Sequence, residues 1–306
     1  MGRVMRVGVA GAGYFGRFHA QKVAQGARSV LAGVHDPDAG RAAALAGEMG
    51  CAALGWEALL AASEAVVIAS PAAAHFEAAA AALRAGKHVL VEKPLAATLD
   101  EADALIGLAA ERGLVLQVGH LLRYAPERAA VVARVARPRL IECVRVAPFR
   151  PRGTDVSVVL DLMVHDLDMV LSLVAAPLVE VRAAGAVVAS GRLDLARAWL
   201  GFADGTTAVL SASRVAAAVE RRMVVCGAEG VVELDFGARS LRHVRPHSSA
   251  GAGAEETAGW EAADLIAAEH AAFAAAVLDG APVLVDGAAG RRALEAALRV
   301  EQAASS

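Results

Sequence analysis

Residues 7–20 read VGVAGAGYFGRFHA, where a short apolar run meets the glycine pattern Gly11-x-Gly13-x-x-Gly16. The run is typical of a strand buried on both faces, and Tyr14–Gln25 is predicted to be a helix. At such a junction the first glycine permits a tight turn, and the second lets backbone approach a pyrophosphate. The third lets the helix pack on the strand. The helix N-terminus then offers unpaired N–H groups to an anion.

Asp36 follows Gly16 by 20 residues, at the end of a second predicted strand, Ser29–His35. A carboxylate at this place accepts hydrogen bonds from the adenosine ribose hydroxyls and repels a 2′-phosphate. The glycine pattern alone is a weak signal, but in this context it predicts a dinucleotide site that prefers NAD to NADP. The alternative is that Asp36 caps a helix that starts at Pro37, a position that proline tolerates.

Strand-like and helix-like segments alternate through the first part of the chain. The expected strands are Val4–Ala10, Ser29–His35, Cys51–Leu54, Ala65–Ala69, His88–Glu92 and Leu114–Val118. The expected helices are Tyr14–Gln25, one from Pro37 onward, Trp56–Ala61, Ala74–Ala85 closed by Gly86, and Thr98–Arg112 with a Thr98/Glu101 capping box. This alternation predicts an α/β Rossmann domain over residues 1–119, with a parallel sheet that binds ligands at the carboxyl ends of its strands.

The rhythm changes after residue 119, where strand-like segments follow one another. The expected helices are Pro126–Val135, Asp161–Val174, Glu261–Leu278 and Gly287–Ala303. The expected strands are Leu140–Ala147, Val179–Val188, Leu193–Phe202, Thr206–Ser213, Met223–Cys226 and Val231–Phe236, with a hairpin turn at Asp204-Gly205 and a loop over Ser248–Gly259. This pattern predicts an α+β domain over residues 120–306 with an open-faced, mostly antiparallel sheet. Its last helices are expected to pack back on the first domain.

Composition excludes several classes of partner. The 306 residues carry 30 basic and 33 acidic side chains, and this balance leaves no surplus to neutralise a nucleic acid. No apolar run approaches the ~18–20 residues of a membrane span, and the first residues lack the layout of a signal peptide. The three cysteines are odd in number and far apart, so we expect neither a disulfide framework nor a cysteine zinc site, and a cytoplasmic location.

Lys93 is one of only three lysines, and it follows the predicted strand His88–Glu92 in the sequence Glu92-Lys93-Pro94. Ligands bind at this edge of a parallel sheet. An ammonium group here can polarise a hydroxyl or carbonyl group and share its proton. The alternative is an ordinary surface lysine after a strand.

Asp161 and His165 are four residues apart on one predicted helix, and Asp168 follows three residues later. A carboxylate one turn before an imidazole can fix its tautomer and raise its basicity, which suits proton transfer. A metal site is disfavoured because no third ligand has suitable spacing, and a buried structural histidine remains the other alternative. His120 and Arg123 follow the last predicted strand of the first domain, at the ligand-binding edge of the sheet. The alternative is that they begin a helix and that the charge of Arg123 is incidental.

Four stretches resemble the Gfo/Idh/MocA oxidoreductases, and together they cover essentially the whole chain. They are VGVAGAGYFGRFHA with its trailing His19, ASPAAAHFEAAAAALRAGKHVLVEKPLA (69–96), LQVGHLLRYAP (116–126) and AFAAAVLDGAPVLVDGAAGRRALEAA (272–297). Among these, AGKHVLVEKP is the most specific. The resemblance implies an NAD-dependent enzyme whose second domain forms homodimers or homotetramers through its sheet.

The resemblance also implies roles for individual residues. Lys93 would bind the reacting hydroxyl group, and His165, oriented by Asp161, would exchange its proton. The expected cofactor-binding residues are Gly11, Gly13, Tyr14, Phe15, Gly16, Asp36, Ser70, Pro71, His75, Glu92 and Lys93. The expected substrate-binding residues are His120, Arg123, Tyr124, Arg152, Asp161 and His165.

RGTDVSVVLDLMVHDLDMV (152–170) is similar to the family members that act on UDP-N-acetylglucosamine. Those members typically contain Arg-Phe-Asn-Pro where this chain has Arg123-Tyr124-Ala125-Pro126. The expected activity is therefore oxidation of a secondary hydroxyl group of a sugar, with a nucleotide sugar oxidised at C3 as the favoured substrate. The alternatives are an inositol or free-monosaccharide dehydrogenase and a non-catalytic sugar-sensing regulator. Intact Lys93, Asp161 and His165 favour an enzyme over a regulator.

Overall fold

The structure of the chain is a computed structural model that describes residues 3–151, 154, 156–246 and 254–305. The described chain divides into two compact units. The first unit comprises residues 1–124 and 264–291, and the second comprises residues 125–263 and 292–306. Each unit is described by itself below.

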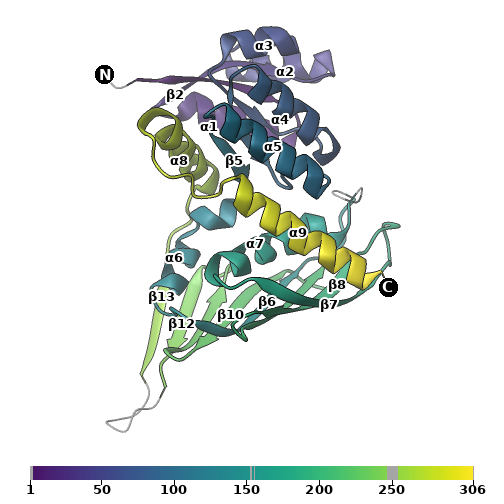
Figure 1. The fold of residues 1–306 in the computed structure, drawn as a ribbon, viewed down its shortest axis with the longest axis vertical. Coiled ribbons are helices and arrows are strands. Elements are labelled where there is room, and N and C mark those ends of the chain that lie inside the picture. Colours follow the sequence, from purple (N-terminus) through teal and green to yellow (C-terminus); the bar gives the residue numbers. More distant parts are fainter. Residues whose placement is uncertain (1–2, 152–153, 155, 247–253, 306) are drawn as a thin grey trace. The chain divides into compact units, whose positions relative to one another are not determined.

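The first unit contains a parallel sheet of five strands within the described residues, in the order β2-β1-β3-β4-β5 (Figure 1). The strands are β1 Met5–Ala10, β2 Ser29–His35, β3 Ala65–Ile68, β4 His88–Glu92 and β5 Leu116–Gly119. The helices are α1 Tyr14–Gln25, α2 Ala39–Met49, α3 Trp56–Ala62, α4 His75–Arg84, α5 Leu99–Glu111 and α8 Leu265–Asp279, with the short turns η1 Ala72–Ala74 and η2 Leu121–Tyr124. The predicted α/β class with a parallel sheet is confirmed.

Apolar side chains of the sheet form the core of this unit. Val7, Val9 and Leu90 are fully buried against residues of α1, α2 and α8, among them Val23 and Phe273. The chain runs from β1 to β2 on one side and later to β3 on the other side of β1. The strand order therefore reverses between β1 and β3, which is where parallel α/β sheets bind their ligands.

Local sequence signals agree with several element ends in this unit, but one predicted helix start and one predicted strand are wrong. Thr98 and Glu101 form the expected capping box of α5, and Gly86 follows α4 with φ +74°. The prediction that Pro37 begins a helix is wrong, because the Asp38 side chain accepts from the Gly40 and Arg41 N–H groups and α2 starts at Ala39. The predicted strand Cys51–Leu54 is also wrong, since this segment contributes a single bridge between Val34 and Ala53.

The second unit contains a sheet of eight strands within the described residues, in the order β13-β12-β11-β10-β6-β9-β8-β7. Neighbouring strands are antiparallel except for the parallel pair β6 and β9. The strands are β6 Pro138–Val146, β7 Leu178–Ala186, β8 Leu195–Phe202, β9 Thr207–Ser213, β10 Glu220–Gly227, β11 Gly230–Asp235, β12 Ser240–Val244 and β13 Glu255–Gly259. The mostly antiparallel sheet is confirmed, but the loop expected over Ser248–Gly259 is wrong at Glu255–Gly259, which pairs with β12.

The helices of the second unit are α6 Pro126–Val132, α7 Val164–Leu173 and the part of α9 (Gly287–Ala304) that begins at Arg292. The single helix expected over Asp161–Val174 is wrong in its first turn, because Val159–Met163 forms a π-helical turn that leads into α7. A π-helical turn closes i→i+5 hydrogen bonds. Asp161 and His165 therefore do not share the regular α-helical spacing that the sequence predicted.

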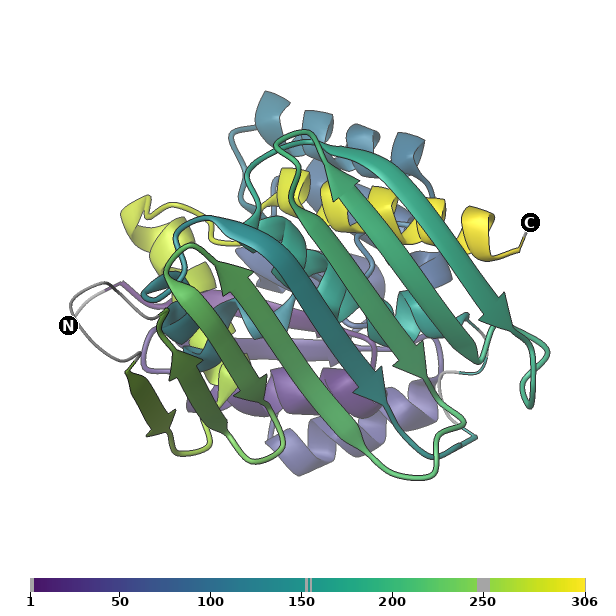
Figure 2. The same ribbon diagram turned by 90° about the horizontal axis from the view of Figure 1, so that it is seen from below.

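The two faces of the second sheet differ. Strand β8 alternates regularly, with Ala196, Ala198 and Leu200 buried and Leu195 and Trp199 exposed. The buried face contacts α7 and the π-helical turn. The opposite face, turned towards the viewer in Figure 2, carries no helix of the described residues.

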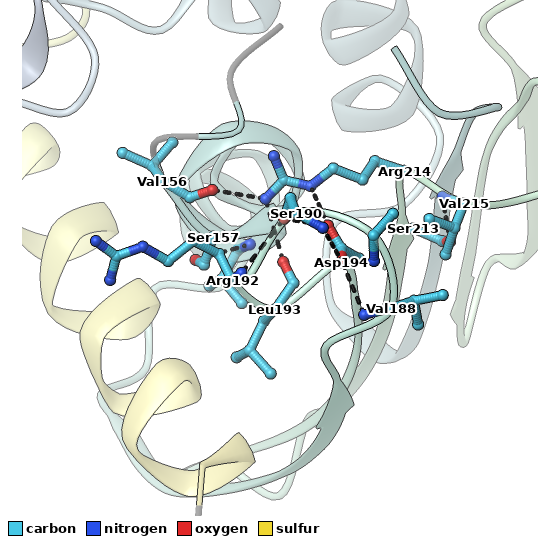
Figure 3. A network of polar contacts seen from close by, with 12 residues as sticks. Val156, Ser157, Val188, Ser190, Arg192, Leu193, Asp194, Ser213, Arg214 and Val215 are labelled. Carbon is cyan, nitrogen blue, oxygen red and sulfur yellow. Dashed lines mark hydrogen bonds and ion pairs between the residues drawn. The ribbon is translucent and has the colours of Figure 1, made fainter. Parts of the chain in front are cut away.

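A buried polar network fixes the segment that precedes the π-helical turn (Figure 3). Asp194 accepts hydrogen bonds from the backbone N–H groups of Val188, Ala189 and Ser190 at 2.7–3.0 Å, and its carboxylate pairs with Arg214 at 3.3 Å. Arg214 in turn donates to the carbonyl oxygens of residues 156 and 193 at 2.6 and 3.1 Å. The end of β9 is thereby tied to the chain just before the helix that carries Asp161 and His165.

Among the described residues, no helix is both long and apolar enough to cross a bilayer.

Candidate active site

The glycine loop joins β1 to α1 in the first unit. Gly11 has φ +105°, and a Cβ atom there would lie 2.5 Å from the carbonyl oxygen of Ala69. A Cβ atom at Gly16 would lie 1.7 Å from the carbonyl oxygen of Gly11, so neither position accepts a side chain. Gly13 differs, because it is exposed and a Cβ atom there would meet no atom within 4 Å. The loop therefore presents bare backbone to open space at Gly13.

Asp36 is tied to this loop. Its Oδ2 accepts from the Ala12 N–H at 2.7 Å, and its Oδ1 accepts from the Asp38 N–H at 2.9 Å. The alternative interpretation of Asp36 as a helix cap is wrong, since Asp38 caps α2. Asp36 is half-buried at the end of β2, so a carboxylate stands beside the glycine loop, as a ribose-binding acid requires.

The segment after β3 lies against the same loop, because Gly11 approaches Ala69 and Ser70. The Ser70 hydroxyl is buried and has no hydrogen-bond partner within the described residues. The ring nitrogens of His75 lie 2.7 Å from the Pro94 carbonyl oxygen and 2.9 Å from that of Ser70. This histidine therefore links the segment after β3 to the one after β4. Three groups in this region fit a bound dinucleotide. They are the bare backbone at Gly13, the carboxylate of Asp36 and the unpartnered hydroxyl group of Ser70.

The exposed first turn of α1 borders the loop. Tyr14 is exposed and Phe15 is half-buried, and the two rings meet edge to face with centroids 5.5 Å apart. Pro71 is exposed just before η1. These three predicted cofactor-binding residues stand at the ends of β1 and β3, where the strand order reverses.

Glu92 ends β4, and Lys93 follows it directly. Glu92 is 7% exposed, and its Oε1 accepts from His19 Nε2 at 2.8 Å while its Oε2 accepts from the Lys93 backbone N–H at 3.2 Å. Burial raises the pKa of Glu92, but the hydrogen bond from His19 and the charges of His19 and Lys93 together bring this pKa below its usual value. A buried carboxylate therefore stands directly beside half-buried Lys93.

The residues after β5 belong to the same edge, because Glu92 pairs with Gly119 across β4 and β5. His120 is buried, and Arg123 and Tyr124 are half-buried in η2. Arg123 Nη2 donates to the carbonyl oxygen of Leu284 at 3.2 Å. The first unit thus brings His120, Arg123 and Tyr124 to the edge where Lys93 lies.

The second unit carries Asp161 in the π-helical turn and His165 at the start of α7, and both are half-buried. The Ser157 hydroxyl accepts from the N–H groups of residues 159 and 160 at 3.2 and 3.3 Å and so fixes the start of the turn. The neighbouring Asp166 is buried, and its two carboxylate oxygens accept hydrogen bonds from Arg145 at 2.7 and 2.9 Å. Asp168 is also buried.

Arg152, which the sequence placed in the substrate set, lies outside the described residues. No group of three or more His, Cys, Asp or Glu side chains within those residues has the arrangement of a metal site.

The sequence did not connect His19 with His270. Their rings lie in contact, with Nδ1 of His19 2.9 Å from Nε2 of His270, although 251 positions separate them. His19 was singled out only as part of the glycine motif. The single available signal was the position of His19 on the inner face of α1, one turn after Gly16.

A parallel sheet with a glycine loop, a carboxylate beside that loop and a lysine after a strand end is typical of a nicotinamide-dependent oxidoreductase. Residues 5–120 match the family described as "Oxidoreductase family, NAD-binding Rossmann fold", and residues 130–233 match the "GFO/IDH/MocA C-terminal domain". The chain belongs to the Gfo/Idh/MocA family, as the sequence motifs indicated. It is an NAD(P)-dependent oxidoreductase that acts on CH–OH groups, with NAD as its cofactor.

Individual relatives are similar over different shares of the chain. UDP-N-acetylglucosamine 3-dehydrogenase from Acidithiobacillus ferrooxidans is 44% identical over 98% of this chain and 97% of its own length. A crystal form of that enzyme superposes with a TM-score of 0.92 and covers 98% of this chain and 97% of that chain. Inositol 2-dehydrogenase from Rhizobium meliloti is 30% identical over 74% of each chain.

Proposed function

We propose that this enzyme oxidises a secondary hydroxyl group of a nucleotide sugar, namely the 3-hydroxyl group of UDP-N-acetylglucosamine. The observation that carries the proposal is the 44% identity, over nearly the full length of both chains, to an enzyme of that activity. Sequence and fold agree over the same span, since the TM-score with that enzyme is 0.92.

The first unit supplies the cofactor site. The N–H groups around Gly13 and the start of α1 bind the pyrophosphate, and Asp36 accepts from the ribose hydroxyls. The Ser70 hydroxyl gains a hydrogen-bond partner from the bound dinucleotide. When bound, NAD supplies the acceptor for the hydride that leaves the substrate carbon.

Lys93 and His165 supply the proton chemistry. Lys93 binds the reacting hydroxyl group and stabilises the negative charge that develops on its oxygen. The hydroxyl proton passes to His165, since Lys93 as an ammonium ion can only donate, while the carbon loses its hydride, so the alcohol becomes a ketone. Asp161 orients His165 and stabilises the imidazolium that forms when this ring takes the proton.

Arginine suits the diphosphate of a nucleotide sugar, because its planar guanidinium group binds phosphate oxygens in pairs. Arg123, at the same sheet edge as Lys93, and Arg152 are the proposed contacts. His120 and Tyr124 complete the proposed sugar site, because they follow β5, whose last residue pairs with Glu92 at the end of β4.

The test is NADH formation at 340 nm, with a trapping amine that pulls an unfavourable equilibrium forward. We expect turnover of UDP-N-acetylglucosamine, and a loss of about 10²–10⁴-fold in Lys93→Ala, as for other positioned proton-transfer groups. The affinity for NAD stays within about twofold, an energy difference well below 1 kcal/mol. Lys87→Ala is the matched control, because Lys87 precedes the opposite end of β4 and donates to the Ser63 carbonyl oxygen at 2.9 Å.

Turnover of myo-inositol without turnover of nucleotide sugars would overturn the proposed substrate. The proposed reaction, oxidation of a secondary hydroxyl group, would still hold. Oxidation of inositol is the second candidate, favoured by the 30% identity to an inositol 2-dehydrogenase. Equal turnover in wild type and Lys93→Ala would instead remove Lys93 from the mechanism. NAD and sugar binding without any turnover would identify a regulator.

Assembly and location belong to the same proposal. We propose a homodimer or homotetramer that covers the open face of the second sheet, because Leu195 and Trp199 are 42% and 40% exposed there. A cytoplasmic location is supported by the cysteines, all three of which are described and free of disulfides.

A further inference from the structure

A buried chain of polar side chains crosses the first unit behind Lys93. Nε2 of His19 lies 2.8 Å from Oε1 of Glu92, and Nδ1 of the same ring lies 2.9 Å from Nε2 of His270. His19 is fully buried, and Glu92 and His270 are each 7% exposed. The proposed reaction uses neither histidine, although His19 binds one oxygen of the carboxylate that precedes Lys93 and His270 binds His19.

The direction of the bond to Glu92 follows from charge. The pKa of Glu92 lies below its usual value, so Glu92 is a carboxylate at neutral pH and only accepts. Nε2 of His19 therefore carries a proton and donates it. Removing that donor would leave a buried carboxylate short of a partner, and burial would then favour its neutral form.

His270 holds the other side of the His19 ring. The pKa of His270 falls to about 3, because burial and the charge of His19 both disfavour its cation. His270 is thus neutral at physiological pH and partners Nδ1 of His19 without adding charge. It also lines a cavity of about 440 Å³, where the ion pair of Lys22 and Asp264 stands at 2.8 Å.

Glu269 is the second buried carboxyl group near His19 and His270. It is fully buried next to His270 in α8, and both of its carboxyl oxygens lack a hydrogen-bond partner within the described residues. Burial and the charge of Glu92 raise the pKa of Glu269 well above its usual value, which favours the neutral, protonated form of this side chain. The charged form is favoured at Glu92, whose pKa lies below its usual value.

We propose that His19 and His270 are positioning residues that hold the Glu92 carboxylate ionised beside Lys93, and that Glu92 thereby keeps the Lys93 side chain an ammonium ion. The proposal deepens the proposed function, on which the role of Lys93 rests. In this proposal His19, which ends the glycine motif, acts on the charge of Lys93 and does not bind the cofactor.

The test compares two substitutions of the same histidine. In His19→Gln the amide nitrogen takes the place of Nε2 and can still donate to Glu92, whereas in His19→Asn it takes the place of Nδ1 and cannot. The readout is the acetylation rate of Lys93 against pH, measured by mass spectrometry on the ligand-free chain. Its midpoint is the pKa of Lys93, which a neighbouring carboxylate raises. This readout needs no turnover, so it stands even if the proposed substrate is wrong.

We expect the Lys93 midpoint to fall by about one unit in His19→Asn and in Glu92→Gln, and to stay near the wild-type value in His19→Gln. His270→Phe should shift it in the same direction by a smaller amount. The double variant His19→Asn/Glu92→Gln should match Glu92→Gln alone, because His19 acts through Glu92. In turnover assays the pH profile of kcat/KM should move with the midpoint.

An unchanged midpoint in both His19→Asn and Glu92→Gln would overturn the proposal. So would equal shifts in His19→Asn and His19→Gln, or a further shift when His19→Asn is added to Glu92→Gln. If His19→Asn does not fold, Glu92→Gln and His270→Phe decide, and an unchanged midpoint in either then refutes the proposal.

Discussion

The Ala12 N–H in the middle of the glycine loop donates to Oδ2 of Asp36 at 2.7 Å, although the two residues are 24 positions apart. The bond ties the glycine loop to the end of β2. A carboxylate offers about four lone-pair sites, so Asp36 can hold the loop and still accept from a ribose. Asp36 thus helps to fix the position of the loop, and we propose that the same carboxylate sets the preference for NAD over NADP.

Asp36→Ala should therefore reduce the difference between the affinities for NAD and NADP. In the wild type we expect NAD to bind at least tenfold more tightly than NADP, about 1.4 kcal/mol, because the carboxylate repels a 2′-phosphate. Calorimetry with both cofactors measures the preference. Asp38→Ala is the control, since it removes the cap of α2 at about 1 kcal/mol of stability and should leave the preference unchanged. Equal wild-type affinities for the two cofactors would refute this assignment.

Gly13→Ala should weaken the binding of NAD without lowering the stability of the fold. A Cβ atom at Gly13 meets no protein atom within 4 Å, so the melting temperature should hold while NAD affinity falls at least tenfold, about 1.4 kcal/mol. Gly47→Ala is the matched control, because its Cβ atom also meets open space but lies in α2. It should stabilise the chain by about 0.5–1 kcal/mol and leave NAD binding intact. Undiminished NAD binding by Gly13→Ala would place the pyrophosphate elsewhere.

Trp199→Glu should break the proposed assembly. Trp199 is 40% exposed on the open face of the second sheet, and burying a charge there against a partner is costly. Multi-angle light scattering at micromolar concentration should show a dimer or tetramer for the wild type and a smaller species for the variant. Val30→Glu is the control, since Val30 is 48% exposed on β2 of the first unit. A monomeric wild type would rule out the assembly.

Asp194→Asn tests how the network in Figure 3 depends on pH. Burial alone would raise the pKa of Asp194, but three backbone N–H groups and the Ser190 hydroxyl lower it well below its usual value. The unfolded chain takes up this proton near pH 4. The folded chain still excludes the proton there, so the stabilisation is complete above that pH and is lost as the pH falls.

The free energy of unfolding should therefore differ most between wild type and Asp194→Asn at pH 7, and the difference should shrink between about pH 5 and pH 3. Urea unfolding at several pH values measures it. Asp100→Asn, at an exposed position of α5, provides the comparison and should show no such trend. A difference that is constant from pH 7 to pH 3 would mean that the charge of Asp194 does not stabilise the fold.

Much of the fold was predictable because its signals are local. The glycine loop, the Thr98/Glu101 capping box and the alternation in β8 each depend on residues a few positions apart. The π-helical turn was not predictable in this way. Its start is fixed by Ser157, and the chain before it is held by Arg214. This residue directly follows β9 and lies 58 positions beyond Val156, whose carbonyl group it binds. Strand β13 was missed for a similar reason, since only its pairing with β12 makes Glu255–Gly259 extended.

The sequence by itself determined the class of protein. Three local signals indicate a nicotinamide-dependent enzyme, namely the glycine spacing, Asp36 at the end of the second strand, and the Glu92-Lys93-Pro94 motif. Tertiary structure alone decided how Glu92 and Lys93 are surrounded. The contact between His19 and His270 joins the first and last helices of the first unit. A pKa in this cluster depends on burial and on charges brought together by packing, and sequence distance does not report either quantity.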